Sequence, residues 1–346
     1  MDITTTDAVV IERPKQTSFR SIKLTEVTPD SIVCRTTLSA ISSGTDMKTW
    51  RGQQHSTSCW YPLVPGYENV GVIEQIGPEA KTSLQVGDRV MINECRKFGD
   101  VCAAWGGNAR YIIKNSVTAP SPFDYAVKIP DRVSDRDAVL GYLACVSLKG
   151  VSRFSFDGQE NILVIGAGMI GIGAMQALKI LNPKARIICL ERSAFRRDIA
   201  SHYADLVIPA DDDAVAAVRE ATGGKMADKL VECSGNPTVV GGLHKYVKEG
   251  GWTESEPPAH IHLQGDYPER IVLDSWNHWF CKNCTVTMSC ALAPGNKETV
   301  LGWLDSGRFD TSHLPVETFP VEKCHEAFTA KEKAGDKIFK VILDWA

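Results

Sequence analysis

The sequence predicts an α/β protein of two domains, one built of short strands and one of strands that alternate with helices. The chain has 346 residues, about twice the roughly 150 residues of a typical domain. Short β-type segments broken by Gly and Pro fill the first 150 residues, whereas buried strands and helical segments alternate from about residue 160. We therefore expect a barrel-like all-β unit and a doubly wound parallel sheet covered by helices on both faces.

The barrel-like unit is predicted from a series of apolar, β-branched segments that turn residues separate. These segments are 8–11, 31–38, 70–76, 89–92, 109–113 and 127–129. Short strands at this spacing are typical of barrels and sandwiches.

The parallel sheet is predicted from buried strand segments and from segments with helical spacing of apolar residues. The strands are 161–165, 186–190, 229–233 and 285–288, and the helices are 169–181, 215–221 and 239–247. The tail adds a helix around 321–333 and a last strand at 339–343. Strand and helix alternation of this kind favours a parallel sheet.

Composition excludes several classes of partner. Lys and Arg number 38 and Asp and Glu 42, a net charge of −4, and no basic block interrupts this balance. Nucleic acid and anionic membranes are therefore not expected as partners. The longest apolar stretch, 162–175, is rich in Gly and shorter than the roughly 20 residues that span a bilayer. The first residues lack the pattern of a secretory signal, so we expect a cytoplasmic protein with its 11 cysteines as free thiols and a small-molecule partner.

A Gly-x-Gly-x-x-Gly motif carries the most specific chemistry. It follows a predicted strand and opens a predicted helix. Gly166 permits a tight turn, Gly168 allows a pyrophosphate to approach the backbone, and Gly171 lets the helix pack on the strand. Met169 and Ile170 lie in the first turn of the helix, whose free N–H groups suit phosphate. The motif predicts a dinucleotide site, and the alternative is a glycine-rich turn of another α/β fold.

The choice between NAD and NADP rests on the end of the second strand of this unit. Glu191 lies about 20 residues beyond the motif, where a carboxylate accepts hydrogen bonds from the ribose hydroxyls of NAD and repels the extra phosphate of NADP. Arg192, Arg196 and Arg197 follow closely and could bind that phosphate. The sequence favours NAD as the cofactor, with NADP as the alternative.

Several segments together resemble a known family. They are Gly66-Tyr67-Glu68 with the residues up to Gly71, and then 87–90, 106–111 and 231–237. They resemble the signature segments of the medium-chain dehydrogenase/reductase superfamily, which includes the zinc alcohol dehydrogenases. The resemblance implies a GroES-like catalytic domain at 1–150, a Rossmann NAD(P)-binding domain at 151–290 and a return to the catalytic domain at 291–346. It also implies cofactor contacts at Ser234 and Gly235 and a homodimer formed through the edge of the Rossmann sheet.

The zinc ligands of the family are replaced in this chain. Zinc members hold the catalytic metal by a Cys before Thr-Asp, the His of Gly-His-Glu and a Cys or Glu before the nucleotide domain. By alignment these positions are Ser43, Tyr67 and Tyr142, which are poor ligands because Zn²⁺ prefers thiolate, imidazole or carboxylate. The four-cysteine lobe is reduced to Cys95 and Cys102. We expect no zinc of either kind.

Without a metal, side chains must handle the proton of the substrate hydroxyl. The resemblance puts Thr45 against the substrate oxygen and Lys48 where zinc members carry a relay histidine, so Lys48 is a candidate base or else a surface lysine. Tyr67, next to Glu68, is a candidate for orienting or protonating the substrate oxygen. Tyr142 has the same candidate role, and the alternative for both tyrosines is that they fill the volume that the ligands vacate.

Two further groups of potential metal ligands lack the additional ligands that a metal site needs. Cys281 and Cys284 have metal-like spacing without a second pair, and we expect them to be buried packing residues. His260 and His262 alternate as on a strand, without a third ligand, and we expect them at the surface.

One branch of the family is the best match. Residues 43–46, 61–68 and 340–345 resemble the zinc-lacking branch that contains the hydroxyethyl bacteriochlorophyllide dehydrogenases. This implies an NAD-dependent enzyme that interconverts a secondary alcohol and a ketone on a polar or ring-bearing small molecule. Two alternatives remain: a zinc-free, NADPH-dependent reductase of a conjugated C=C bond or quinone, and an inactive dinucleotide-binding sensor.

Overall fold

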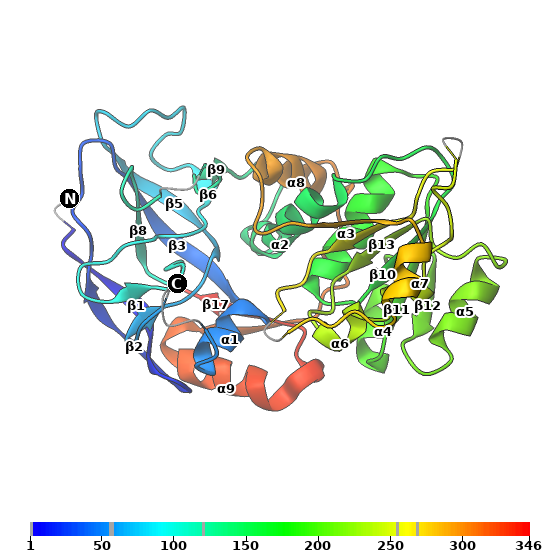
Figure 1. The fold of residues 1–346 in the computed structure, drawn as a ribbon. Helices are drawn as coiled ribbons and strands as arrows, with labels where there is room; N and C mark the ends of the chain where they lie inside the picture. The colour runs from blue at the N-terminus through cyan, green and yellow to red at the C-terminus, as the bar shows by residue number, and fades with distance from the viewer. Residues whose placement is uncertain (1–2, 55–58, 120–121, 254–255, 268–269) are drawn as a thin grey trace. The chain divides into compact units, whose positions relative to one another are not determined.

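The chain folds into two compact units (Figure 1). The computed structural model describes residues 3–54, 59–119, 122–253, 256–267 and 270–346. The barrel unit comprises Met1–Tyr142 and Lys297–Ala346, and the parallel-sheet unit comprises Leu143–Asn296. The predicted α/β fold, with one β-rich unit and one parallel sheet, is confirmed.

The barrel unit contains two sheets, one with the order β2-β1-β4-β7 and one with the order β16-β17-β3-β5-β6-β9, in which β8 also pairs with β3. Its strands are β1 (Thr5–Arg13), β2 (Gln16–Lys23), β3 (Ile32–Ile41), β4 (Leu63–Val64), β5 (Glu68–Ile76), β6 (Arg89–Met91), β7 (Cys102–Ala103), β8 (Tyr111–Lys114), β9 (Val127–Lys128), β16 (Val316–Pro320) and β17 (Lys340–Asp344). Its helices are α1 (Thr45–Trp50), α8 (Asn296–Asp305) and α9 (Cys324–Ala334), together with the first part of α2 (Asp135–Val151). Strand β17 pairs with β3, so the C-terminal segment completes the sheet that the N-terminal part begins.

The alternation of side chains along β1 divides the interior of the barrel unit into two cores. Val9 and Ile11 pack into one core with Phe328 of α9, whereas Ala8 and Val10 face a second core. Successive side chains of a strand point to opposite faces, so one apolar strand can serve both cores. Burial of each such Val or Ile side chain stabilises the fold by about 1.5–3 kcal/mol.

The parallel-sheet unit has the strand order β12-β11-β10-β13-β14-β15, with every pair parallel. The strands are β10 (Asn161–Ile165), β11 (Arg186–Glu191), β12 (Leu206–Pro209), β13 (Lys229–Glu232), β14 (His260–Leu263) and β15 (Thr285–Met288). The helices are α3 (Met169–Leu181), α4 (Ala194–Ala200), α5 (Ala214–Ala221), α6 (Pro237–Val240) and α7 (Trp276–Cys281). Renumbered within the unit, the order is 3-2-1-4-5-6, which is typical of dinucleotide-binding sheets.

Three expectations from the sequence are wrong in this unit. The helix expected over 239–247 is broken into α6 and a short 3-10 turn, Leu243–Lys245, with Gly241 and Gly242 between them. His262 is fully buried rather than at the surface, because its ring bonds Thr287 and Ser289 of the neighbouring strand segment. Cys281 is exposed, since it ends a helix on the outside of the unit.

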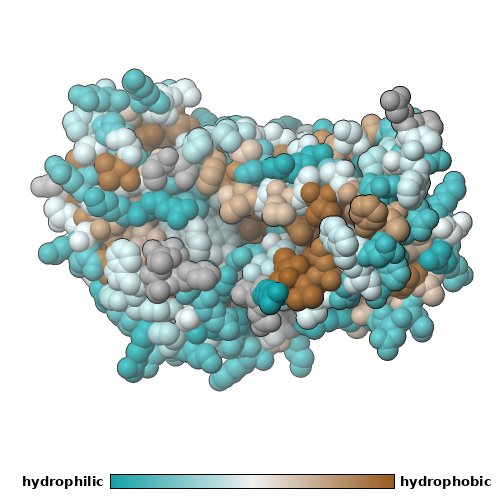
Figure 2. Space-filling model, viewed as in Figure 1, coloured by the Kyte–Doolittle hydropathy of each residue, from teal (hydrophilic) through white to brown (hydrophobic). Residues whose placement is uncertain are grey.

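The visible surface is mainly hydrophilic, with hydrophobic side chains gathered in a few patches (Figure 2). Within the described residues, no helix combines the length and apolar character that crossing a bilayer requires.

Candidate functional site

The glycine-rich turn of the parallel-sheet unit forms an open cradle. Gly166 adopts a positive φ of 92°, and a Cβ there would lie 2.9 Å from the Cα of Ser234. A Cβ on Gly171 would lie 1.9 Å from the carbonyl oxygen of Gly166, so only glycine lets α3 pack this closely. At Gly168 the nearest atom to such a Cβ is Nη1 of Arg196, at 3.9 Å. The turn therefore leaves the space and the helix N-terminus that a pyrophosphate needs.

Glu191 is fixed at the end of β11 by two backbone groups. Its Oε2 accepts a hydrogen bond from Ala167 N at 2.7 Å, and its Oε1 accepts one from Ser193 N at 2.8 Å. The side chain is buried, while Arg192 is exposed. Arg197 donates to the Arg192 carbonyl at 2.6 Å. The acid is thus held directly beside the glycine turn, where a ribose hydroxyl would meet it.

A cluster of hydroxyl groups lies in the barrel unit, where the chain leaves β3 and enters α1. The Tyr67 hydroxyl donates a hydrogen bond to Ser42 Oγ at 2.7 Å and lies 3.3 Å from Thr45 Oγ1. Burial raises the pKa of the Tyr67 phenol, which therefore stays protonated at neutral pH. The rings of Trp105 and Tyr142 have centroids 6.0 and 5.6 Å from that of Tyr67. We call Ser42, Thr45 and Tyr67 the hydroxyl cluster.

Two further predicted site residues, Ser43 and Lys48, lie close to this cluster in the chain. Ser43 is exposed, and the neighbouring Ser42 contacts the Tyr67 hydroxyl in its place. Lys48 lies three residues after Thr45 in α1, on the same face of the helix, and is half-buried. Sequence reasoning missed Ser42 because two adjacent serines offer the same hydroxyl and only the fold selects one of them.

Asp46 links the two chain segments that carry the hydroxyl cluster. Its carboxyl group is fully buried and accepts hydrogen bonds from Ser42 N at 2.9 Å and Gly66 N at 3.0 Å. Burial raises the pKa of Asp46 to about 7, outweighing these two donors. The acid thereby joins the segment that carries Ser42 to the one that carries Tyr67.

Glu68, predicted as a site residue, forms an ion pair with Lys340. The two side chains are fully buried, with Nζ 2.6 and 2.7 Å from the two carboxylate oxygens. Burial raises the pKa of Glu68, and the ammonium group of Lys340 opposes that rise. No local pattern in the sequence points to Lys340, because the pair joins residues that are 272 positions apart.

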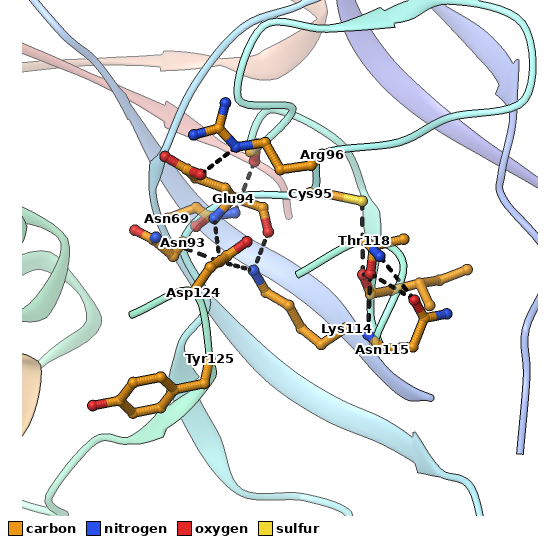
Figure 3. A network of polar contacts seen from close by, with 12 residues as sticks. Asn69, Asn93, Glu94, Cys95, Arg96, Lys114, Asn115, Thr118, Asp124 and Tyr125 are labelled. Carbon is orange, nitrogen blue, oxygen red and sulfur yellow. Dashed lines mark hydrogen bonds and ion pairs between the residues drawn. The ribbon is translucent and has the colours of Figure 1, made fainter. Parts of the chain in front are cut away.

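A second buried polar network holds residues 93–96 of the same unit (Figure 3). Lys114 is ion-paired with Asp124 and also donates to the carbonyl oxygen of Glu94. The Glu94 carboxylate accepts a hydrogen bond from Arg96 Nε at 2.6 Å, and burial raises the pKa of Glu94. The Arg96 guanidinium lies 6.0 Å from the centre of the Trp105 ring, which also contacts the tyrosine of the hydroxyl cluster. The network therefore helps to position Trp105, whose ring packs against that of Tyr67.

The cysteines of the barrel unit pack within its two hydrophobic cores. Cys95 and Cys102 are buried, and Cys95 Sγ lies 3.7 Å from the carbonyl oxygens of Lys97 and Ile113. Over the described ranges, no three His, Cys, Asp or Glu side chains gather as a metal site would require.

Two family models match the chain. "Alcohol dehydrogenase GroES-like domain" matches residues 28–131, and "Zinc-binding dehydrogenase" matches residues 170–253. The chain belongs to the zinc-type alcohol dehydrogenase-like, medium-chain dehydrogenase/reductase superfamily. The first match covers the hydroxyl cluster, and the second begins in the first turn of α3 and covers Gly171, Glu191 and Gly235.

Curated relatives in this superfamily span nearly the whole chain. The chain is 25% identical to a 2-desacetyl-2-hydroxyethyl bacteriochlorophyllide A dehydrogenase of Cereibacter sphaeroides, over 98% of each protein. It is 28% identical to an L-threonine 3-dehydrogenase of Caldanaerobacter subterraneus subsp. tengcongensis, over 86% of this chain and 87% of the relative.

Solved structures show the same fold. An alcohol dehydrogenase from Escherichia coli CFT073, complexed with NADH, matches with a TM-score of 0.82 and 21% identity over 99% of this chain and all of that one. The 2R,3R-butanediol dehydrogenase of Bacillus subtilis matches with a TM-score of 0.80 and 19% identity over the same shares. These likenesses confirm the predicted combination of a GroES-like domain and a Rossmann sheet.

Proposed function

We propose that the chain is an NAD-dependent dehydrogenase that interconverts a secondary alcohol and a ketone without a catalytic zinc ion. The substrate class is a polar or ring-bearing small molecule. The observation that carries the proposal is the hydroxyl cluster, in which Tyr67 lies within hydrogen-bond reach of Ser42 and Thr45. The names of curated relatives, which include an alcohol dehydrogenase, an L-threonine 3-dehydrogenase and a probable D-xylulose reductase, support an oxidoreductase that acts on a CH–OH group.

The parallel-sheet unit offers a fitting site for the cofactor. The open cradle at Gly168 and the N-terminus of α3 suit the pyrophosphate, and Glu191 suits a ribose that carries no phosphate. Met169, Ile170, Ser234 and Gly235 complete the proposed contacts. When bound, NAD+ supplies a hydride acceptor at its nicotinamide ring.

The hydroxyl cluster orients the substrate oxygen. Because the pKa of Tyr67 is raised, its phenol serves as a hydrogen-bond donor to the ketone oxygen, and as the proton source for the alkoxide in the reducing direction. In the oxidising direction the proton follows the same path in reverse: the Tyr67 phenol passes its proton to Lys48, next to Thr45 on α1, as it takes the proton of the substrate hydroxyl, and Lys48 returns a proton to Tyr67 in the reducing direction. Tyr142 forms an aromatic wall beside the phenol, and Glu68 holds the start of β5 through Lys340.

The donor set at the family's metal position does not fit zinc. The alignment puts Ser43, Tyr67 and Tyr142 there, and neutral hydroxyl groups are poor ligands for Zn²⁺. The phenol of Tyr67 is also bonded to Ser42 and has a raised pKa, so it resists the ionisation that metal ligation favours. These observations support zinc independence despite the wording of the second family model.

A cofactor-reduction screen tests this function. The purified protein is mixed with NAD+ or NADP+ and a panel of polyols, cyclitols and ring-borne secondary alcohols, and the absorbance of the reduced nucleotide is followed. We expect NADH to form with at least one class of secondary alcohol. Turnover of enones or quinones with NADPH alone would instead favour the reductase alternative, and cofactor binding without any turnover would favour the sensor.

We extend the proposal to a cytoplasmic homodimer. Strand β15 ends the parallel sheet, and its Val286 and Met288 side chains are 43% and 66% exposed. An edge strand with apolar side chains suits pairing with a second copy. Light scattering of the wild type and of Met288→Lys tests this, with a dimer expected for the wild type and a weakened dimer for the variant.

A further inference from the structure

The parallel-sheet unit contains a buried carboxylate that the proposed function leaves unused. Glu232 ends β13 and is fully buried. Its Oε1 accepts hydrogen bonds from the backbone N of Ser234, at 2.8 Å, and from the Ser234 hydroxyl, while its Oε2 accepts one from the Tyr267 hydroxyl. Burial raises the pKa of Glu232, and these donors oppose that rise. Three neutral donors directed at one carboxyl group stabilise its ionised form.

The groups that hold Glu232 also line the carboxyl edge of the sheet. A Cβ on Gly166 of the glycine turn would lie 2.9 Å from the Cα of Ser234. A Cβ on Gly265, just after β14, would lie 2.9 Å from the Cα of Gly235 and 3.0 Å from Cζ of Tyr267. Only glycines allow these segments to come so close together. The Glu232 carboxylate therefore bonds residues of two tightly packed loops, which follow β13 and β14.

The strand order places the loops after β13 and β14 on the nicotinamide side of the proposed cofactor site. Glu191, which suits the adenosine ribose, ends β11 on one side of the central strand β10. Glu232 ends β13 on the other side of β10. A dinucleotide lies across the point where the strand order reverses, so its nicotinamide half falls on the β13 and β14 side.

We propose that the Glu232 carboxylate, held by Ser234 and Tyr267, sets the preference of this site for the oxidised over the reduced nicotinamide nucleotide. The inference rests on the proposed function, because it requires that the site binds NAD. The oxidised ring carries a positive charge that the reduced ring lacks. A buried negative charge on the same edge therefore stabilises the oxidised form selectively. Tyr267 is a positioning residue, since it acts on the nucleotide only through the carboxylate.

The test is the ratio of the dissociation constants of NAD+ and NADH, measured by calorimetry for the wild type and for Glu232→Gln. The variant keeps the shape of the side chain and removes its charge. We expect the ratio Kd(NAD+)/Kd(NADH) to rise about tenfold, which corresponds to about 1.4 kcal/mol. Tyr267→Phe keeps the Glu232 carboxyl group but removes one hydrogen bond that stabilises its ionised form. This variant should therefore raise the ratio Kd(NAD+)/Kd(NADH) by a smaller factor.

Asp205→Asn is the matched control. Asp205 also accepts a backbone hydrogen bond in this unit, from Ile187 N at 2.8 Å, but it lies at the amino end of β12. The ratio should stay at the wild-type value in this variant. An unchanged ratio in a folded Glu232→Gln protein, or in Tyr267→Phe if the first variant does not fold, overturns the inference and leaves the proposed function standing. A wild type that binds neither nucleotide overturns both.

Discussion

Lys340 donates hydrogen bonds to both carboxylate oxygens of Glu68, and neither side chain is exposed. Glu68 begins β5 and Lys340 begins β17, and both strands pair with β3. The pair therefore ties the C-terminal strand to the segment that carries Tyr67. We therefore expect the geometry of the hydroxyl cluster to depend on Lys340, although this residue lies far from the cluster in the sequence.

Replacement of Lys340 should destabilise the protein strongly. Lys340→Met leaves the Glu68 carboxylate buried without its cation, which costs about 3–5 kcal/mol. Urea denaturation measures the free energy of unfolding. The double variant Glu68→Leu/Lys340→Met should recover most of the loss, because an apolar pair of similar volume replaces the ion pair.

The control for this experiment is an exposed ion pair of the same unit. Lys128 pairs with Asp88 at 2.6 Å, but its side chain is 58% exposed. Lys128→Met should therefore cost less than about 1 kcal/mol. Equal losses for the two single lysine variants would contradict the role assigned to Lys340.

Asp46 should make stability depend on pH. The pKa of its carboxyl group is about 7 in the folded protein, against an ordinary value of 3.8. Below the ordinary value the group is protonated in both states and its contribution to stability is fully present. As the pH rises toward 7, ionisation favours the unfolded state, so this contribution is lost.

The comparison with Asp46→Asn isolates this effect. Between pH 4 and pH 7, we expect the unfolding free energy of the wild type to fall relative to that of the variant by more than about 1.4 kcal/mol, the equivalent of a pKa change of one. Denaturation at several pH values measures the difference. A difference that is constant, or that grows in favour of the wild type, would show that Asp46 is ionised in the folded protein.

Loss of the Tyr67 hydroxyl should reduce turnover with little change in fold. Tyr67→Phe removes the donor to Ser42 and to the substrate oxygen, and we expect kcat to fall by about 100-fold or more. Tyr125→Phe is the control, because that hydroxyl bonds Glu298 at 3.1 Å instead. If both variants turn over as fast as the wild type, the phenol has only a packing role.

Glu191 should decide between NAD and NADP. Glu191→Ala removes the carboxylate that repels a ribose phosphate, so the affinity for NADP+ relative to NAD+ should rise about tenfold or more. Equilibrium binding of the two nucleotides measures this ratio. Glu220→Ala, which removes an exposed acid from α5 of the same unit, should leave it unchanged. A wild type that already prefers NADP+ would contradict the assignment.

The local geometry of the proposed cofactor site follows from the sequence more directly than the hydroxyl cluster does, for a physical reason. The glycine motif and Glu191 act through turns and strand ends, which local residue types dictate. The hydroxyl cluster depends on which of two adjacent serines faces Tyr67, and the burial of the Glu68 carboxylate depends on its pairing with Lys340. Both features therefore arise from tertiary contacts that local sequence does not specify. The burial of His262 is of the same kind, because the neighbouring strand segment supplies its partners.

The most direct test of the central claim is turnover of the metal-free protein. Protein stripped with a chelator and verified by elemental analysis is assayed with NAD+ and an alcohol that the screen identifies. We predict the same kcat before and after stripping, with no gain on adding Zn²⁺. Activity that disappears with the chelator and returns with Zn²⁺ would contradict an alcohol dehydrogenase that works through Tyr67, Ser42 and Thr45.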